Sequence, residues 1–166
     1  EKNKGARSYI NVLGNGIVAS IFAVLYYVVP QYYSLDSNIF LVGFLGSLAT
    51  AAADTAGGEI GRLSSYKPRL ITTLKVVETG VDGGVTLLGE FAELVIAFLI
   101  GIVAYLFGLG DIRIIFITGI AGFLGANIDS VVGATLETWY DSFGNNHTNI
   151  MATIAGGILG SILYYL

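Results

Sequence analysis

The chain has no cysteine, one histidine, only two prolines and few charged side chains. Without cysteine there is neither a disulfide framework nor a thiolate zinc site, and a single histidine excludes an imidazole-rich metal site. The sequence also lacks a Gly-Lys pair, which a Walker A loop requires, as well as the HExxH and GxSxG motifs. Conventional soluble kinases, proteases and hydrolases are therefore excluded.

What the chain has instead is apolar surface: 54% of its residues are hydrophobic and 12% are charged, whereas soluble proteins have about a quarter charged. A helix needs about 20 apolar residues to cross the hydrocarbon layer. We therefore expect an all-α, polytopic transmembrane bundle that forms a single membrane domain over residues 1–166. The expected spans are about Ser8–Val29, Asn38–Gly61, Gly84–Gly108, Ile112–Leu136 and Asn149–Leu166. Because no Met or signal core opens the chain, we expect further helices upstream.

The positive charges are unevenly distributed. Seven of the eight Lys and Arg residues lie before the first span or in the connection 62–86, and only Arg113 lies elsewhere. In an integral plasma-membrane protein the positive-inside rule places both basic segments in the cytoplasm. We therefore expect residues 62–86 to form a cytoplasmic loop rich in basic residues and glycine.

Four acidic side chains are expected at one depth near this cytoplasmic face. Asp54 comes sixteen residues after Asn38, and Asp129 comes sixteen residues after Arg113, which is about 24 Å along a helix in each case. Glu90 and Glu93 share one face of the third span, close to its cytoplasmic start. An ionised carboxylate inside a span costs a few kcal/mol unless it has a partner. Oxygen ligands without Cys or His indicate Mg²⁺, although pairing with Arg or Lys, or a place among lipid headgroups, is an alternative.

The connection itself has the composition of an anion site. It combines a cation, hydroxyls and glycines just before the third helix, and the N-terminus of a helix attracts phosphate. The residues are Thr72, Thr73, Lys75, Thr79 and the segment Gly80–Thr86. The alternative is a basic loop that only touches anionic lipid headgroups. The first span adds a polar stripe at the same depth, formed by Arg7, Asn11 and Asn15.

Four segments together resemble a known family: ADTAGGEIG, KPRLITTLK, ETGVDGGVTLLGE and ANIDSVVGATLE. From about Arg7 onward the chain resembles the integral membrane family that includes the plant phytyl phosphate kinases and the animal transmembrane protein 19 group. More distantly, the arrangement of Asp54, Lys75, Gly80 and Gly83 is similar to that of the CTP-using phytol and dolichol kinases and the CDP-diacylglycerol synthases.

The resemblance implies a membrane kinase that transfers a phosphoryl group from a nucleotide, CTP above all, to an isoprenyl monophosphate such as phytyl or geranylgeranyl phosphate. Asp54, Lys75 and Asp129 are then the expected catalytic residues. Mg²⁺ is expected on Asp54 and Asp129, with Glu59 or Glu90 as further ligands. The residues expected to bind substrate or nucleotide are Asn11, Asn15, Glu59, Arg62, Arg69, Thr72, Thr73, Gly80, Gly83, Gly84, Thr86, Asn127 and Ser130.

Three other functions stay open on the sequence alone. Acidic residues in spans also mark ion or solute transporters, although these acids lie near one face and not at the midplane. A non-catalytic membrane scaffold and a cytidylyltransferase that makes a CDP-lipid are the other two. The expected partners are a nucleotide, an isoprenyl phosphate and the bilayer, without nucleic acid, and the Gly-rich helix faces favour a homodimer.

Overall fold

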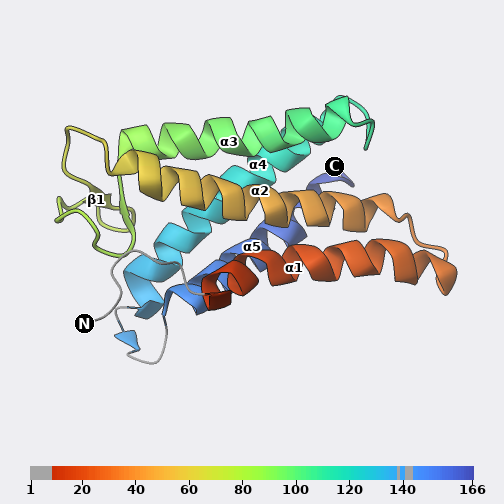
Figure 1. Ribbon diagram of the computed structural model, residues 1–166, viewed down its shortest axis with the longest axis horizontal. Coiled ribbons are helices and arrows are strands. Elements are labelled where there is room, and N and C mark those ends of the chain that lie inside the picture. Colours follow the sequence, from red (N-terminus) through yellow and green to blue (C-terminus); the bar gives the residue numbers. More distant parts are fainter. Residues whose placement is uncertain (1–8, 138, 141–143) are drawn as a thin grey trace.

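The computed structural model describes residues 9–137, 139–140 and 144–166, with side chains from residue 14 onward. Its main elements are five α-helices and one small sheet (Figure 1). The helices are α1 (Tyr9–Val28), α2 (Asn38–Gly61), α3 (Leu87–Leu106), α4 (Arg113–Val132) and α5 (Asn145–Leu163). The 3₁₀ turn η1 (Val29–Gln31) follows α1, the π-helical turn η2 (Gly133–Glu137) continues α4, and strands β1 (Arg69–Leu70) and β2 (Gly84–Val85) lie between α2 and α3.

The predicted helical membrane bundle is confirmed, and the number of spans is approximate. In the described part of the chain, four helical segments are long and apolar enough to cross a membrane: Gly14–Gln31, Asn38–Gly61, Leu87–Leu106 and Arg113–Glu137. The fifth expected span corresponds to α5, which is not among the four by length and composition. Its first turn, Asn145–Thr148, is polar, so the helix starts earlier and is less apolar than predicted.

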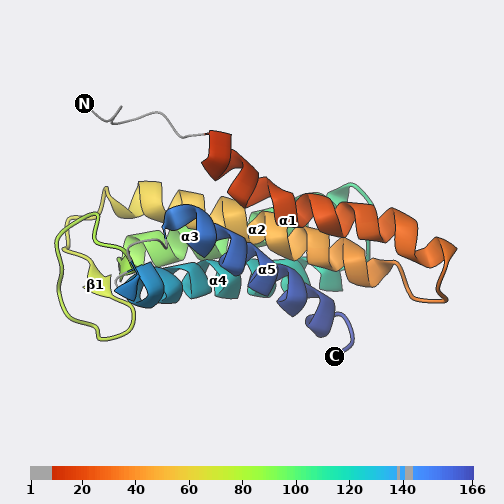
Figure 2. The same cartoon turned by 90° about the horizontal axis from the view of Figure 1, so that it is seen from below.

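Helix α2 is the centre of the bundle and contacts α1, α3, α4 and α5. Helix α3 packs on α2 and α4, whereas α1 packs on α2 and α5 (Figures 1 and 2). The C-terminal ends of α2 and α4 and the N-terminal ends of α3 and α5 lie at one end of the bundle, at the left of Figure 1, together with residues 62–86. We call this end the loop end and the opposite end the turn end.

Small residues form the interior of the bundle, and large apolar residues face outward. Ala49, Ala53 and Ala97 are fully buried, while bulky side chains such as Phe91 and Phe116 are exposed. At Gly46 a side chain would collide with the backbone carbonyl of Gly156, so α2 and α5 approach each other closely. This arrangement is typical of helices that associate by backbone packing in lipid.

The loop between α2 and α3 is held by a short antiparallel sheet in which Arg69 pairs with Val85 and Leu70 with Gly84. Its second half rests on α4. Gly83 has a φ of +71°, and a Cβ there would lie 2.5 Å from the carbonyl oxygen of Ser130, so only glycine fits this contact. Because Gly84 belongs to β2 and Thr86 caps the next helix, α3 begins at Leu87, three residues later than the sequence predicted.

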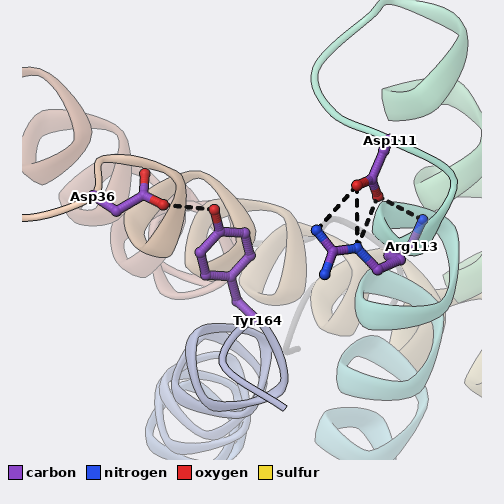
Figure 3. Close-up of polar contacts among 4 residues, drawn as sticks. All are labelled: Asp36, Asp111, Arg113 and Tyr164. Carbon is purple, nitrogen blue, oxygen red and sulfur yellow. Dashed lines mark hydrogen bonds and ion pairs between the residues drawn. The ribbon is translucent and has the colours of Figure 1, made fainter.

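At the turn end, polar side chains pair with one another (Figure 3). The Tyr164 hydroxyl donates a hydrogen bond of 2.6 Å to Asp36, which ties the end of α5 to the turn between α1 and α2. The Arg113 guanidinium pairs with Asp111, with 3.0 Å between Nη2 and Oδ2. A small cavity of about 110 Å³ lies beside Tyr164 and Arg113.

Candidate functional site

The loop end contains a cavity of about 210 Å³ between α2, α3, α4 and residues 62–86. Acidic side chains and glycines make up most of its wall. The lining residues are Asp54, Gly57, Gly58, Gly61, Arg62, Ser64, Tyr66, Pro68, Thr79, Gly80, Val81, Asp82, Gly83, Gly84, Val85, Thr86, Gly89, Glu90, Glu93, Asp129 and Ser130. The structure thus gathers at one place segments that lie up to 76 residues apart in the sequence, since Asp54 and Ser130 both belong to the wall.

Four carboxyl groups from three helices meet in this cavity: Asp54 from α2, Glu90 and Glu93 from α3, and Asp129 from α4. The Asp54 and Asp129 carboxyl groups lie within hydrogen-bonding contact of each other. Glu93 is only 5% exposed and lies within electrostatic range of the other three acids. Helical geometry explains the meeting, because the rise per residue brings each acid to the same end of its helix.

Glycine makes room for the most buried of these acids. A Cβ at Gly57 of α2 would collide with the Glu93 carboxylate, so the carboxylate occupies the space that a side chain would otherwise fill. Asn127 of α4 supports Glu93 from the other side, with 3.5 Å between its Nδ2 and Glu93 Oε2 and a stronger bond of 3.0 Å to the Phe123 carbonyl. Asn127, which was expected to bind substrate, thus contacts an acid of the cavity wall.

The cavity has an excess of negative charge. Arg62 is the only basic residue among the described residues that line it, and this guanidinium pairs at 3.6 Å with Glu59, both side chains being largely exposed. Two further acids extend the cluster, because Asp82 and Glu137 lie within electrostatic range of Asp129 or of each other. Such a concentration of like charges in a membrane protein requires a compensating cation or a proton.

Five buried side-chain atoms in the described chain have no hydrogen-bond partner, and two of them, Glu90 Oε1 and Asp129 Oδ1, belong to residues of the cavity wall. A buried acceptor without a partner is costly, and its usual explanation at a functional site is an ion or a water. No group of three or more acidic or histidine side chains in the described residues forms a complete metal site. Mg²⁺ usually takes only one or two protein carboxylates and completes its shell with phosphate and water, so it does not need such a group. The two carboxyl groups in contact with each other are those of Asp54 and Asp129.

Several of the predicted binding residues do line the cavity: Arg62, Gly80, Gly83, Gly84, Thr86 and Ser130. Not all of their groups are free for a ligand. The Gly84 N–H donates to the Val81 carbonyl at 3.0 Å. The Thr86 hydroxyl accepts from the Gly89 N–H at 3.1 Å and so acts as the N-cap of α3.

Other predicted residues lie outside the cavity. Lys75, Arg69, Thr72 and Thr73 are exposed on the hairpin that follows β1, where the Leu70 N–H donates to the Lys75 carbonyl at 2.9 Å. This bond turns the chain back at residue 75, and Lys75, which was predicted to be catalytic, is not among the residues that line the cavity.

The remaining expected residues are also separate from the cavity. Glu59 is exposed and paired with Arg62, away from the cavity wall, so it is not grouped with Asp54 and Asp129 as a metal ligand. Asn15 lies on α1 and is half-buried, but it does not line the cavity. The Asn11 side chain is outside the described residues.

Sequence reasoning missed three polar residues of the loop that line the cavity: Ser64, Tyr66 and Asp82. Asp82 is the most informative, because it adds an acid from the loop to those of the helices. The available signal was an acid directly before the two glycines at 83 and 84, in a loop already expected to bind a ligand. Glu137 was missed because it lies in η2, at the end of the α4 segment.

Comparison with known proteins identifies a family whose sequence pattern matches this chain. The family model described as "Integral membrane protein DUF92" matches residues 1–157. The membrane protein MJ0933 of Methanocaldococcus jannaschii is 44% identical over 159 residues, which are 95% of this chain and 63% of that protein. Protein PGR of Arabidopsis thaliana is 33% identical over 82% of this chain and 54% of its own length. No solved structure matches the chain significantly.

A further relative is Protein VTE6, chloroplastic, of Arabidopsis thaliana, which is 31% identical over 112 residues, or 65% of this chain and 32% of that protein. The chain thus spans about a third to two thirds of the length of these relatives. The resemblance to the integral membrane family of the plant phytyl phosphate kinases is confirmed.

Proposed function

Because the chain belongs to the integral membrane family DUF92, we propose that it is the core of a membrane kinase that phosphorylates an isoprenyl monophosphate. The donor in this proposal is a nucleotide, CTP above all, and the acceptor is a lipid such as phytyl or geranylgeranyl phosphate. The observation that carries the proposal is the meeting of four carboxyl groups from three helices in one cavity beside a glycine-rich loop.

Phosphoryl transfer fits this site because it depends on positioning and charge neutralisation more than on covalent catalysis. In the proposal Asp54 and Asp129 hold Mg²⁺, which would offset the charge of the phosphate oxygens. Glu90 lines the same wall with a buried Oε1 that has no hydrogen bond, but no group of three acids in the described residues could hold a metal, so the proposed ligands are Asp54 and Asp129. Glu59 is no longer part of the proposed ligand set, because it does not line the cavity and its carboxylate pairs with Arg62.

The other residues of the wall position the two substrates. Arg62 is the cation that lines the cavity, so it is the proposed partner of a phosphate oxygen in place of Lys75. The loop at Gly80 allows the backbone to approach a phosphate closely, because this residue has a positive φ and nothing lies within 4 Å of an added Cβ. The acceptor is already an ionised phosphate, so the site needs no strong general base.

The bilayer supplies the lipid substrate in this proposal. The outward faces of α2 and α3 carry exposed apolar side chains, and this supports the proposal that a prenyl tail lies in the same layer as the helices. We place the loop end in the cytoplasm, because the described connection 62–86 contains Arg62, Lys67, Arg69 and Lys75. A nucleotide would then reach the cavity from the cytosol.

The test is an assay of the purified full-length protein with labelled CTP, Mg²⁺ and geranylgeranyl monophosphate. We expect prenyl diphosphate and CDP, with a loss of about 100-fold or more in kcat/KM for Asp54→Asn. The control is Asp111→Asn at the turn end, which makes the same chemical change on an exposed aspartate and is expected to keep full activity.

Each other outcome identifies a rival function. Release of pyrophosphate in place of CDP indicates cytidylyl transfer to the lipid phosphate. No turnover with any nucleotide indicates a transporter or a scaffold, and equal turnover in Asp54→Asn and the wild type contradicts the assigned site.

A further inference from the structure

The loop between α2 and α3 exposes bulky apolar side chains, most of which do not line the cavity. Leu63, Tyr66 and Leu74 are 78%, 84% and 66% exposed. Of these three, only Tyr66 lines the cavity. Exposed apolar residues gathered on one segment usually mark a contact with a partner or a membrane.

Leu74 is held outward by the backbone. It has a φ of +58°, a left-handed conformation that is uncommon for a bulky residue. Its N–H donates to the Leu70 carbonyl at 2.8 Å, and its own carbonyl accepts from Arg69 Nη1 at 2.8 Å. Because both polar groups of Leu74 are engaged, the surrounding hairpin fixes this conformation, as is typical of functional positions.

Two basic side chains near this leucine form no ion pair in the described chain. Arg69 and Lys75 are exposed and have no acidic partner in the described chain, whereas the nearby Lys67 is paired at 2.6 Å with Glu78. Residues 69–76, which we call the hairpin tip, thus combine a protruding apolar side chain with two unpaired positive charges. A surface that is apolar and negatively charged complements this combination.

The membrane itself offers that surface. The loop leaves α2 at Gly61 and enters α3 at Leu87, and both helices are long and apolar enough to span the bilayer. Its ends are therefore tied to the membrane face, and anionic headgroups lie within reach. We propose that the hairpin tip docks on anionic lipid, with Leu74 in the headgroup layer and with Arg69 and Lys75 on lipid phosphates.

Docking of the tip has a consequence for the cavity. Strand β1 begins at Arg69 and pairs with β2, which directly follows Gly83 and its contact with α4. The lipid contact is therefore connected through the small sheet to the wall of the cavity. The inference concerns a surface separate from the cavity, and it holds whether or not the protein is a kinase.

A fluorescent label tests the docking directly. Residues 1–166 contain no cysteine, so Leu74→Cys, with any cysteine outside these residues replaced by serine, creates a single attachment site for an environment-sensitive dye. The labelled full-length protein is reconstituted into vesicles of phosphatidylcholine alone or of phosphatidylcholine with phosphatidylglycerol. We expect blue-shifted emission and quenching by a lipid-attached quencher in the anionic vesicles, and reversal of both at high salt.

Two lysine variants, made in the labelled protein, provide the matched control. Lys75→Gln removes an unpaired cation, and the apparent affinity for anionic lipid should fall about fivefold, the effect of one cation near such a surface. Lys67→Gln removes a lysine that is already paired with Glu78, so its effect should be clearly smaller. Equal emission in both vesicle types, equal effects of the two variants, or a blue shift that appears only with an added cytosolic protein would overturn the proposal.

Discussion

The acidic side chains at the two ends of the bundle have opposite surroundings. At the turn end each acid has a partner: Asp36 accepts from the Tyr164 hydroxyl, and Asp111 pairs with Arg113 (Figure 3). These bonds hold the pKa of Asp36 and of Asp111 below their ordinary values, because the Tyr164 hydroxyl and the Arg113 side chain stabilise the ionised carboxylates. The turn end is thus electrostatically complete without a ligand.

At the loop end the acids face one another. Asp54 contacts Asp129, and the buried Glu93 lies near Glu90, while Asn127 is the one side-chain hydrogen-bond donor to Glu93 in the described chain. An arrangement in which neighbours repel is not explained by stability. The difference indicates that the acids of the loop end bind a ligand. Variants at the two ends can test this contrast.

The largest expected effect is that of Mg²⁺ on stability. A cation that binds only the folded protein stabilises it by about 2.7 kcal/mol at a concentration 100 times its dissociation constant. We expect Mg²⁺ to raise the Tm of the purified wild type and of Asp111→Asn. Asp129→Asn should unfold at a higher temperature than the wild type in EDTA, because repulsion is relieved, and should gain little from Mg²⁺. Thermal unfolding in detergent measures this, and an equal gain in all three proteins would contradict a metal on Asp129.

The sequence predicted the acids of the loop end well because one rule governs their depth. In a straight helix the rise per residue is fixed, so a count of sixteen residues along each span is enough to place Asp54 and Asp129 at the same level. Glycines and small residues likewise indicated close helix packing, which Gly46 and Ala49 confirm.

The positions of the loop residues could not be predicted by counting residues along a helix. Lys75 was expected to be catalytic from its place in the family pattern, but it is exposed on the hairpin and does not line the cavity with Asp54. Asp82 was missed because its position depends on the contact of Gly83 with Ser130, a residue of another helix. Contacts between distant segments of this kind do not follow from local periodicity.

A second prediction concerns the space for Glu93. The new methyl group of Gly57→Ala would collide with the Glu93 carboxylate, and overpacking of this kind costs about 1–3 kcal/mol. The control is the next residue, Gly58, where nothing lies within 4 Å of an added Cβ. Gly58→Ala should therefore be neutral or stabilising by up to about 1 kcal/mol, the usual gain in a helix. Chemical denaturation of both variants is the measurement, and equal stabilities would show that Glu93 is free to move aside.

The smallest expected effect lies at the turn end. Tyr164→Phe removes the hydroxyl that donates to Asp36, so the pKa of Asp36 should rise toward its ordinary value. A carboxyl group with a lowered pKa in the folded state contributes stability above its unfolded pKa, and this contribution is lost as the pH falls through the folded value. The Tm difference between wild type and Tyr164→Phe should thus be present at neutral pH and vanish in strong acid. Tyr165→Phe, which changes the adjacent and largely exposed tyrosine, should leave the pKa of Asp36 unchanged in a carboxyl NMR titration. A difference that persists in strong acid would mean that Tyr164 acts at the turn end through packing and not through the charge of Asp36.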